Sequence, residues 1–409
     1  MMIRCDRHGF SFSRKGFFGA KIAFSLSLLV WLLGAASLHA AQPQYLSLTN
    51  GGWVRTFILY APDNLPTTPC PLVLMLHGAG GTGAEAMTNL TEYRWNQLAD
   101  SNQFIVVYPD GVSNRWHDCR GDASNQPPTD DVNFLSALID YVSALYPVDA
   151  QRVYAAGHSN GAMMCLCLAM ELPGRLAAIC VNCGSLAAVS DCSALSHPIS
   201  LLYCMGTADP IIPFDGGYIQ LDAPASGTVL PASATIALWT NTFSISPVAE
   251  ATNTFPNLVT TDDSTVTEYD FQRTQNGTEL VYLQVNGGGH GWPAPTQFPP
   301  AQILLTGRKN QDIVLCDLAW EFFQRHTLDG PPLQLSAARS GGALQFQWNW
   351  GVLQSSTNFT GWMDLTTGNP TNTFATGLTN YLFSSGEVNL TPTNVPMSAP
   401  ACFFRLKSP

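Results

Sequence analysis

The first three quarters of the chain alternate between short apolar runs and longer stretches with helical periodicity. The runs predicted to be buried strands cover residues 71–76, 104–108, 152–156, 175–182 and 198–205. The stretches predicted to be helices cover residues 84–100, 131–145, 159–171 and 312–326. Strands that are apolar throughout need cover on both faces. This alternation therefore predicts an α/β fold with a mostly parallel central sheet flanked by helices.

Two further patterns predict the outer strands of this sheet. Residues 45–48 and 53–60 flank Asn50-Gly51-Gly52, a turn sequence typical of a β-hairpin. Late strands are expected at 265–273 and 280–285, just before the last predicted helix. The large domain is therefore expected to span residues 42–328.

The pattern changes after the last predicted helix. Residues 329–334 contain Gly330-Pro331-Pro332 and predict a linker. Residues 335–409 are rich in Thr, Ser, Asn and Gly, carry little charge and contain short alternating runs. That pattern suits a small β-sandwich accessory domain. Its tryptophans, Trp348, Trp350 and Trp362, could contact a polymer surface or form the core of the sandwich.

Residues 1–41 have the pattern of a secretory signal peptide. A basic stretch up to Lys21 precedes the apolar run 22–33, and small residues follow that run. Cleavage is expected near Ala40 or Ala41, with residues 34–36 as the other candidate. An uncleaved anchor is the alternative, but the run is short for a bilayer span of roughly 20 residues. The protein is expected to be secreted or periplasmic, without a membrane partner after cleavage.

The amino-acid composition argues against some classes of binding partner. The chain has 409 residues, of which 46% are hydrophobic and only 11% are charged, and its formal net charge is −11. Nucleic-acid phosphates and anionic membrane surfaces require clustered Lys and Arg. The sequence therefore predicts neither nucleic acid nor an anionic membrane surface as a partner.

Eleven cysteines are present, and loss of Cys5 with the signal peptide leaves ten. An even number in an exported chain favours disulfides. A bridge is expected among Cys180, Cys183, Cys192 and Cys204, which lie close together in sequence. A zinc site is the alternative, but the paired ligand spacing that zinc usually requires is absent. No metal is predicted.

The sharpest chemical signal is the sequence Gly157-His158-Ser159-Asn160-Gly161. It lies between a predicted strand and a predicted helix. A Gly-x-Ser-x-Gly sequence in that context is typical of a nucleophile elbow, a tight turn that exposes the serine at the edge of the sheet. The backbone N–H of Asn160 would then face a developing oxyanion. The alternative is an ordinary turn between strand and helix.

A serine hydroxyl needs a base, and the base needs an acid that orients it. His290 follows the last predicted strand and three glycines, which we expect to form a flexible loop that can bring the imidazole to Ser159. Asp209 follows the strand that ends near residue 205 and lies between the serine and the histidine in chain order. Asp191, Asp215 and Asp222 are rival acids. The predicted catalytic triad is Ser159, Asp209 and His290.

The second oxyanion donor is expected after the first core strand. Residues 76–81 read Leu-His-Gly-Ala-Gly-Gly, and glycine allows the backbone to approach a substrate closely. We favour the N–H of Ala79, with Gly78 as the alternative. A phosphate-binding loop is the competing interpretation, but neither nucleotide-binding glycine motif is present.

Together these motifs resemble the secreted polyhydroxybutyrate (PHB) depolymerase-like esterases, a family grouped with feruloyl and acetylxylan esterases. The resemblance runs from about residue 46 to 326. It rests on the two glycine motifs above and on five further segments, 107–111, 130–132, 206–210, 289–293 and 320–323. It implies an α/β-hydrolase fold and the same triad of Ser159, Asp209 and His290.

The hypothesis from the sequence is a serine carboxyl-ester hydrolase that works through an acyl-enzyme and needs no cofactor. Its substrate would be a polymeric or small ester, a PHB-type polyester in the first place. The alternative is a feruloyl or acetylxylan esterase, and an acyltransferase with the same triad is the less favoured reading. His77, Trp116 and Trp292 are predicted to contact the substrate, and the C-terminal domain could contact a polymer surface.

Overall fold

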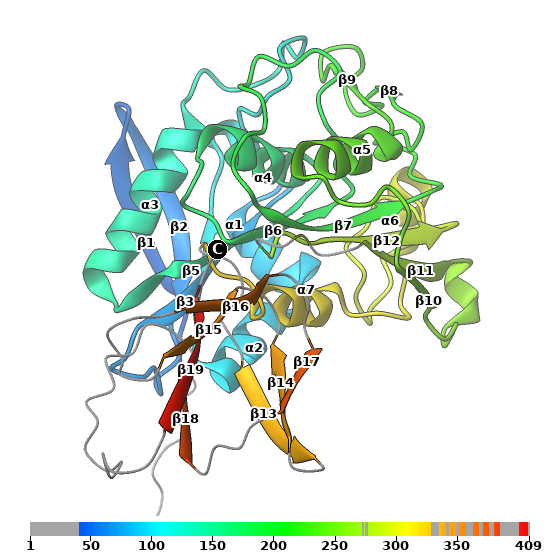
Figure 1. Cartoon of the computed structure of the whole chain (residues 1–409). Coiled ribbons are helices and arrows are strands. Elements are labelled where there is room, and N and C mark those ends of the chain that lie inside the picture. Colours follow the sequence, from blue (N-terminus) through cyan, green and yellow to red (C-terminus); the bar gives the residue numbers. More distant parts are fainter. Residues whose placement is uncertain are drawn as a thin grey trace, which may run out of the picture. The chain divides into compact units, whose positions relative to one another are not determined.

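The fold is described from a computed structural model of the chain (Figure 1). It describes residues 41–328, apart from 272, 273, 275 and 276, and the backbone of seven strands between 335 and 407. Residues 1–40 of the predicted signal peptide and the whole predicted linker, residues 329–334, lie outside the described residues. In the described part, no helix is long and apolar enough to cross a membrane.

A ten-stranded mixed sheet forms the centre of the large domain, in the order β1-β2-β4-β3-β5-β6-β7-β12-β11-β10. Its strands are β1 (Gln44–Asn50), β2 (Trp53–Tyr60), β3 (Cys70–Leu76), β4 (Ile105–Pro109), β5 (Val148–His158), β6 (Ala178–Asn182), β7 (Ser200–Gly206), β10 (Ala251–Thr254), β11 (Thr265–Asp270) and β12 (Leu280–Asn286). The strands from β4 to β12 in that order run parallel. The strands at both edges pair antiparallel. The predicted mostly parallel sheet is confirmed.

Helices cover both faces of this sheet, with α3, α4 and α5 on one face and α2 and α7 on the other (Figure 1). The helices of the described residues are α1 (Gly83–Glu85), α2 (Arg94–Asn102), α3 (Asp131–Leu145), α4 (Asn160–Glu171), α5 (Ala232–Phe243), α6 (Pro300–Thr306) and α7 (Leu315–Phe323), with short helical turns η1 (Ala86–Leu90), η2 (Val112–Asn114) and η3 (Thr260–Asp262). A separate small ribbon pairs β8 (Gly217–Tyr218) with β9 (Thr228–Val229).

Alternate residues of the central strands contribute to two hydrophobic cores. In β3, Leu72 and Leu74 pack with residues of α3, α4 and α5, whereas Val73 and Met75 pack with residues of α2 and α7. Successive side chains of a strand point to opposite faces. A run in which both sets are apolar therefore belongs to a strand that is buried on both sides.

Helix α3 follows the sequence pattern closely. It spans Asp131–Leu145, and a side-chain oxygen of Asp130 accepts a hydrogen bond from the N–H of Asn133 at 2.9 Å. This is the N-cap interaction that satisfies one of the free amides of a first helical turn. Asp130 is therefore the N-cap of α3.

The C-terminal strands form two further sheets. They are β13 (Leu335–Ser340), β14 (Ala343–Trp348), β15 (Val352–Ser356), β16 (Met363–Thr367), β17 (Thr371–Ala375), β18 (Asn380–Ser384) and β19 (Ala401–Lys407). The sheet orders are β13-β14-β17 and β16-β15-β19-β18. The predicted sandwich core and the roles of Trp348, Trp350 and Trp362 depend on side chains outside the described residues, so they remain predictions.

Among the described residues, a disulfide joins Cys119 to Cys192, 73 residues apart. The expectation of a bridge within the group Cys180, Cys183, Cys192 and Cys204 is therefore wrong in its pairing. The other three of these cysteines are free and buried. The pairing follows from loop contact: Arg120 forms a β-bridge with Ser190, so the two loops that carry the bridged cysteines lie side by side.

Removal of this disulfide is expected to lower the free energy of unfolding by about 2–5 kcal/mol, because the bridge closes a long loop in the unfolded chain. The double variant Cys119→Ala/Cys192→Ala avoids leaving a single free thiol. Denaturant unfolding measures the effect, and the buried, unbridged Cys70→Ala serves as control. An unchanged unfolding midpoint in the double variant would show that the bridge does not stabilise the fold.

Candidate active site

Ser159 lies at the junction of β5 and α4. It has φ 57° and ψ −121°, and α4 begins at the next residue. A non-glycine residue in that backbone region is strained and is held there by its surroundings. The serine side chain is thereby placed at the carboxyl end of the parallel strands, beside the free amides of a helix N-terminus.

Gly157 and Gly161 of the motif are required because backbone carbonyl groups lie too close to them for a side chain. A Cβ atom on Gly157 would lie 2.2 Å from the carbonyl oxygen of Gly161. A Cβ atom on Gly161 would lie 2.4 Å from the carbonyl oxygen of Leu76 and 2.6 Å from that of His77. These distances are shorter than van der Waals contact, so any larger residue would push the turn away from β3. The turn and the glycine-rich loop after β3 are built against each other.

Asp209 and His290 form a buried pair. His290 Nδ1 lies 2.7 Å from Asp209 Oδ2, with the two side chains 6% and 0% exposed. The other carboxylate oxygen accepts the N–H groups of Ile211 at 2.8 Å and Ile212 at 2.9 Å. A carboxylate accepts only, so the proton lies on Nδ1 and Nε2 is left free to accept another. Among the rival acids, Asp222 instead pairs with Arg115 at 2.5 Å.

The glycines before His290 are packed closely rather than forming a flexible loop. A Cβ atom on Gly289 would lie 2.4 Å from the carbonyl oxygen of Thr306, and one on Gly206 would lie 2.4 Å from that of Gly288. The N–H of His290 also donates to the Thr306 carbonyl at 2.6 Å. The expectation of flexibility is therefore wrong. The glycines are needed because three backbone segments meet beside the histidine.

Ser159 and His290 line the same pocket, which has a volume of about 820 Å³. His77, Gly78, Ala79 and His158 also line it. The structure thus places the predicted nucleophile Ser159, the predicted base His290 and the predicted oxyanion loop around one cavity. The predicted acid Asp209 is hydrogen-bonded to His290. The volume is in the range of sites that hold small organic ligands.

The His77 ring supports the glycine-rich loop from inside. Its Nδ1 donates to the Gly78 carbonyl at 2.7 Å, and its Nε2 accepts the N–H of Gly111 at 2.9 Å. Burial lowers the pKa of His77, so the ring stays neutral with both nitrogens occupied. The ring thus supports the loop that carries Ala79. His77 also lines the pocket, so its contact with the substrate stays a prediction.

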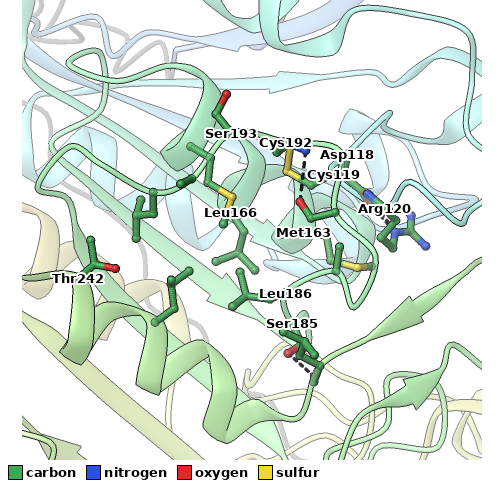
Figure 2. A pocket seen from close by; sticks show the side chains of 17 residues that line it. Asp118, Cys119, Arg120, Met163, Leu166, Ser185, Leu186, Cys192, Ser193 and Thr242 are labelled. Atoms are coloured by element: carbon green, nitrogen blue, oxygen red, sulfur yellow. Dashed lines mark hydrogen bonds and ion pairs between the residues drawn. A yellow bond between two sulfur atoms is a disulfide. The ribbon is translucent and has the colours of Figure 1, made fainter.

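The Asn160 side chain fixes the other predicted oxyanion residue. Its Oδ1 accepts the N–H of Trp116 at 2.7 Å, and its Nδ2 donates to the Trp116 carbonyl at 3.1 Å and to Asp118 Oδ2 at 2.8 Å. Arg120 pairs with the buried Asp118 at 2.8 Å (Figure 2). Because all these groups are buried, they hold the start of α4 in a single position.

Trp116 and Trp292 do not contact the pocket. Both side chains are 0% exposed, and neither lines the pocket around Ser159. Trp116 Nε1 donates to the His77 carbonyl at 2.8 Å, and its ring lies 4.9 Å from the His77 ring. The prediction that these two residues bind the substrate is corrected. Trp116 packs behind the glycine-rich loop, and Trp292 belongs to the hydrophobic core that includes residues of α2 and α7.

His158 is a site residue that the sequence reasoning passed over. Its ring centroid lies 4.7 Å from that of His290, and it lines the same pocket. Asn182 Nδ2 donates to His158 Nδ1 at 2.9 Å and to the Gly291 carbonyl at 3.1 Å. Burial, and then the neighbouring His290 and Lys309, hold the pKa of His158 well below its usual value. The only signal in the sequence was its place beside the nucleophile.

Acidification is expected to destabilise the fold through the buried histidines His77 and His158. Both have folded-state pKa values below the unfolded value of about 6.5, so the unfolded chain binds more protons as the pH falls. Their contribution is present above pH ~6.5 and is lost as the pH falls below it. Urea unfolding at pH 7 and pH 5 measures this loss. In His158→Gln, the free energy of unfolding should fall less between pH 7 and pH 5 than in the wild type. An equal fall in both proteins would show that His158 does not contribute to the acid sensitivity.

A second pocket of about 430 Å³ lies beside the disulfide (Figure 2). Met163, Leu166 and Met170 of α4 and Leu238 of α5 form part of its apolar lining. The Asp118–Arg120 pair lies at its edge, with every guanidinium nitrogen hydrogen-bonded to the carboxylate or to the Ser226 carbonyl. No charged group in this lining is free to bind a ligand, so we assign no function to this pocket.

Cys183 lies close to the acid–base pair. Its sulfur and single ligand atoms of Asp209 and His290 all lie within 4.8 Å of one another. The thiol lies 3.6 Å from the Gly291 carbonyl oxygen, which can only accept a hydrogen bond, and burial raises the pKa of Cys183 well above its usual value. A metal would require the thiolate. The group therefore fits proton transfer better than metal binding.

Comparisons with known proteins place the chain among esterases. Residues 55–220 match the family model described as Esterase PHB depolymerase. A protein of Nocardia uniformis subsp. tsuyamanensis designated as an esterase, NocK, is 31% identical over 278 residues, which is 63% of this chain and 76% of that protein.

Two further relatives have more specific names. Poly(3-hydroxybutyrate) depolymerase of Ralstonia pickettii is 30% identical over 40% of this chain and 38% of its own length. Feruloyl esterase C of Emericella nidulans is 30% identical over 40% of this chain and 58% of its own length. The chain thus spans less than two thirds of either protein. Among solved structures, the acetyl xylan esterase from Aspergillus awamori is 18% identical, with a TM-score of 0.46, over 62% of this chain and 95% of that one.

Proposed function

The chain belongs to the PHB depolymerase family of esterases and is a carboxylic ester hydrolase, and from that premise we propose that Ser159, His290 and Asp209 are its nucleophile, base and acid. The observation that carries the proposal is the 2.7 Å contact between His290 Nδ1 and Asp209 Oδ2, made by a histidine that shares one pocket with the elbow serine. This arrangement supplies the three groups that ester cleavage by serine requires.

The reaction proceeds through an acyl-enzyme. Ser159 Oγ attacks the ester carbonyl while His290 Nε2 takes its proton, and Asp209 stabilises the imidazolium through Nδ1. The N–H groups of Asn160 and Ala79 donate to the oxyanion. The bond between the carbonyl carbon and the leaving oxygen then breaks, and His290 returns the proton to that oxygen as the alcohol leaves. Water, deprotonated by His290, then attacks the acyl carbonyl carbon. The bond from that carbon to Ser159 Oγ breaks, His290 returns the proton to Oγ, and the acid leaves.

The residues behind this site support the oxyanion role. Asn160 is fixed by three hydrogen bonds of its own side chain, and the loop of Ala79 is fixed by the neutral ring of His77. Donors that are held in place before the reaction need no reorganisation when charge develops, which is the main source of their catalytic effect.

For the substrate we propose a polymeric aliphatic ester of the poly(3-hydroxybutyrate) type. The depolymerase of Ralstonia pickettii supports this proposal by its name, and feruloyl esterase C supports the alternative of an ester on plant polysaccharide at the same 30% identity. An acyltransferase is less favoured. Export by the N-terminal signal is part of the proposal, and the Cys119–Cys192 disulfide is consistent with it.

A product assay tests the substrate. The enzyme without residues 1–41 is incubated with poly(3-hydroxybutyrate) particles and, separately, with feruloylated arabinoxylan, and the released acids are identified by mass spectrometry. The proposal predicts 3-hydroxybutyrate or its short oligomers from the particles. Ferulate or acetate from the polysaccharide, with no 3-hydroxybutyrate, would replace the polyester by the plant cell-wall ester. A parallel reaction with an added alcohol detects acyl transfer.

A further inference from the structure

Helix α6 presents an unusual pair of side chains to solvent. Leu304 is 87% exposed and Leu305 is 72% exposed, and no residue of this seven-residue helix is buried. Among the described residues, Leu304 is the most exposed large hydrophobic side chain. Single exposed apolar residues are common on protein surfaces. Two adjacent leucines on a helix that contributes nothing to the core require an explanation other than folding.

The helix borders the catalytic pocket. Gln302, Leu305 and Thr306 line that pocket together with Phe298 and Pro299, which precede the helix. The Thr306 carbonyl accepts the N–H of His290 at 2.6 Å, so the end of α6 is bonded to the proposed base. A molecule whose ester lies between Ser159 and His290 and whose chain continues outward past Leu305 would cover Leu304 next.

The surroundings of α6 select an uncharged partner. Residues 297–306 carry no charged side chain. The nearest cations along the chain are engaged: Arg308 pairs with Asp263 at 3.2 Å and Lys309 with Glu92 at 3.0 Å. An anionic surface would find no free cation on this segment. A hydroxylated polysaccharide would leave the leucines poorly matched, because aliphatic side chains offer no hydrogen bonds.

We propose that α6 is a contact surface for an aliphatic polyester chain, with Leu304 outside the pocket and Leu305 at its rim. The inference rests on the proposed ester-hydrolase function and extends it from the reacting ester to the neighbouring monomer units. Removal of aliphatic surface from water supplies the affinity. The helix delivers the polymer to the pocket because its C-terminal end is bonded to the loop of His290.

Leu304→Ser tests this role, because Leu304 is on the helix but does not line the pocket. Adsorption to amorphous poly(3-hydroxybutyrate) particles is measured with full-length protein that also carries Ser159→Ala, so that the particles are not degraded. We expect the adsorption constant to fall about tenfold, the size expected when one leucine loses its burial. Leu258→Ser is the matched control, since Leu258 is 72% exposed and lies outside the pocket lining.

Two readouts separate this inference from the proposed function. With Ser159 intact, Leu304→Ser should hydrolyse soluble p-nitrophenyl butyrate like the wild type and degrade the particles more slowly. Equal adsorption of Leu304→Ser and Leu258→Ser would overturn the role of α6 while leaving the esterase assignment in place. An equal loss of adsorption to insoluble arabinoxylan would overturn the polyester as partner. Failure of the wild type to hydrolyse the soluble ester would instead contradict the proposed function.

Discussion

Ser159→Ala is expected to lower kcat for ester hydrolysis by at least about a thousandfold, because the variant lacks the hydroxyl that forms the acyl-enzyme. The folded state should persist. The serine side chain is small, and the strained backbone is held by the contacts of Gly157 and Gly161 with neighbouring carbonyl groups. Steady-state hydrolysis of p-nitrophenyl butyrate measures the loss, and a thermal unfolding midpoint close to that of the wild type shows that the fold is retained.

The matched control is Ser143→Ala. Ser143 lies on α3, where its hydroxyl donates to the Ile139 carbonyl at 2.8 Å, and it has no contact with the pocket of Ser159. Its kcat should stay within about twofold of the wild type. Near-wild-type turnover by Ser159→Ala, or an equal loss in Ser143→Ala, would remove Ser159 from the role of nucleophile.

Asp209→Asn is expected to lower kcat by roughly three to four orders of magnitude, as in other serine hydrolases whose acid is replaced by its amide. The asparagine oxygen can still accept the N–H groups of Ile211 and Ile212, so its NH₂ group is turned toward His290. The imidazole must then accept on Nδ1 and carry its proton on Nε2, which leaves no base for Ser159. Hydrolysis of the soluble ester measures the effect.

Asp222→Asn is the control for this variant. Asp222 was a rival acid by sequence position, but it pairs with Arg115 at 2.5 Å and its side chain is 52% exposed. Loss of an exposed ion pair has little effect on stability. Its turnover should therefore remain close to wild type. Full activity of Asp209→Asn together with a collapse in Asp222→Asn would transfer the role of acid to Asp222.

Local chemistry predicted those parts of the site that depend on a few adjacent residues. The nucleophile turn was predictable because only glycine tolerates the 2.2 Å and 2.4 Å approaches at Gly157 and Gly161, and that requirement leaves a sequence signature. Helix α3 was predictable because its apolar period and the Asp130 cap coincide. The Asp209–His290 contact followed from two loops placed at the same edge of a parallel sheet.

Contacts between distant segments were not predictable in the same way. The Cys119–Cys192 bridge depends on the β-bridge between Arg120 and Ser190, which brings two distant loops together. The residues near either cysteine do not predict that contact. The burial of Trp116 depends on a bond from its indole to the His77 carbonyl, 39 residues away. The glycines before His290 are consistent with either a flexible loop or a crowded one, and only the position of Thr306 distinguishes the two.

Covalent labelling of the nucleophile is the most direct test of the proposed mechanism. The enzyme without residues 1–41 is treated with a fluorophosphonate, which phosphonylates an activated serine, and the modified residue is located by peptide mass spectrometry. The mechanism predicts one adduct per chain on the peptide that carries Ser159, loss of esterase activity in step with labelling, and no adduct in Ser159→Ala. An adduct on a different residue, or full activity after stoichiometric labelling of Ser159, would contradict it.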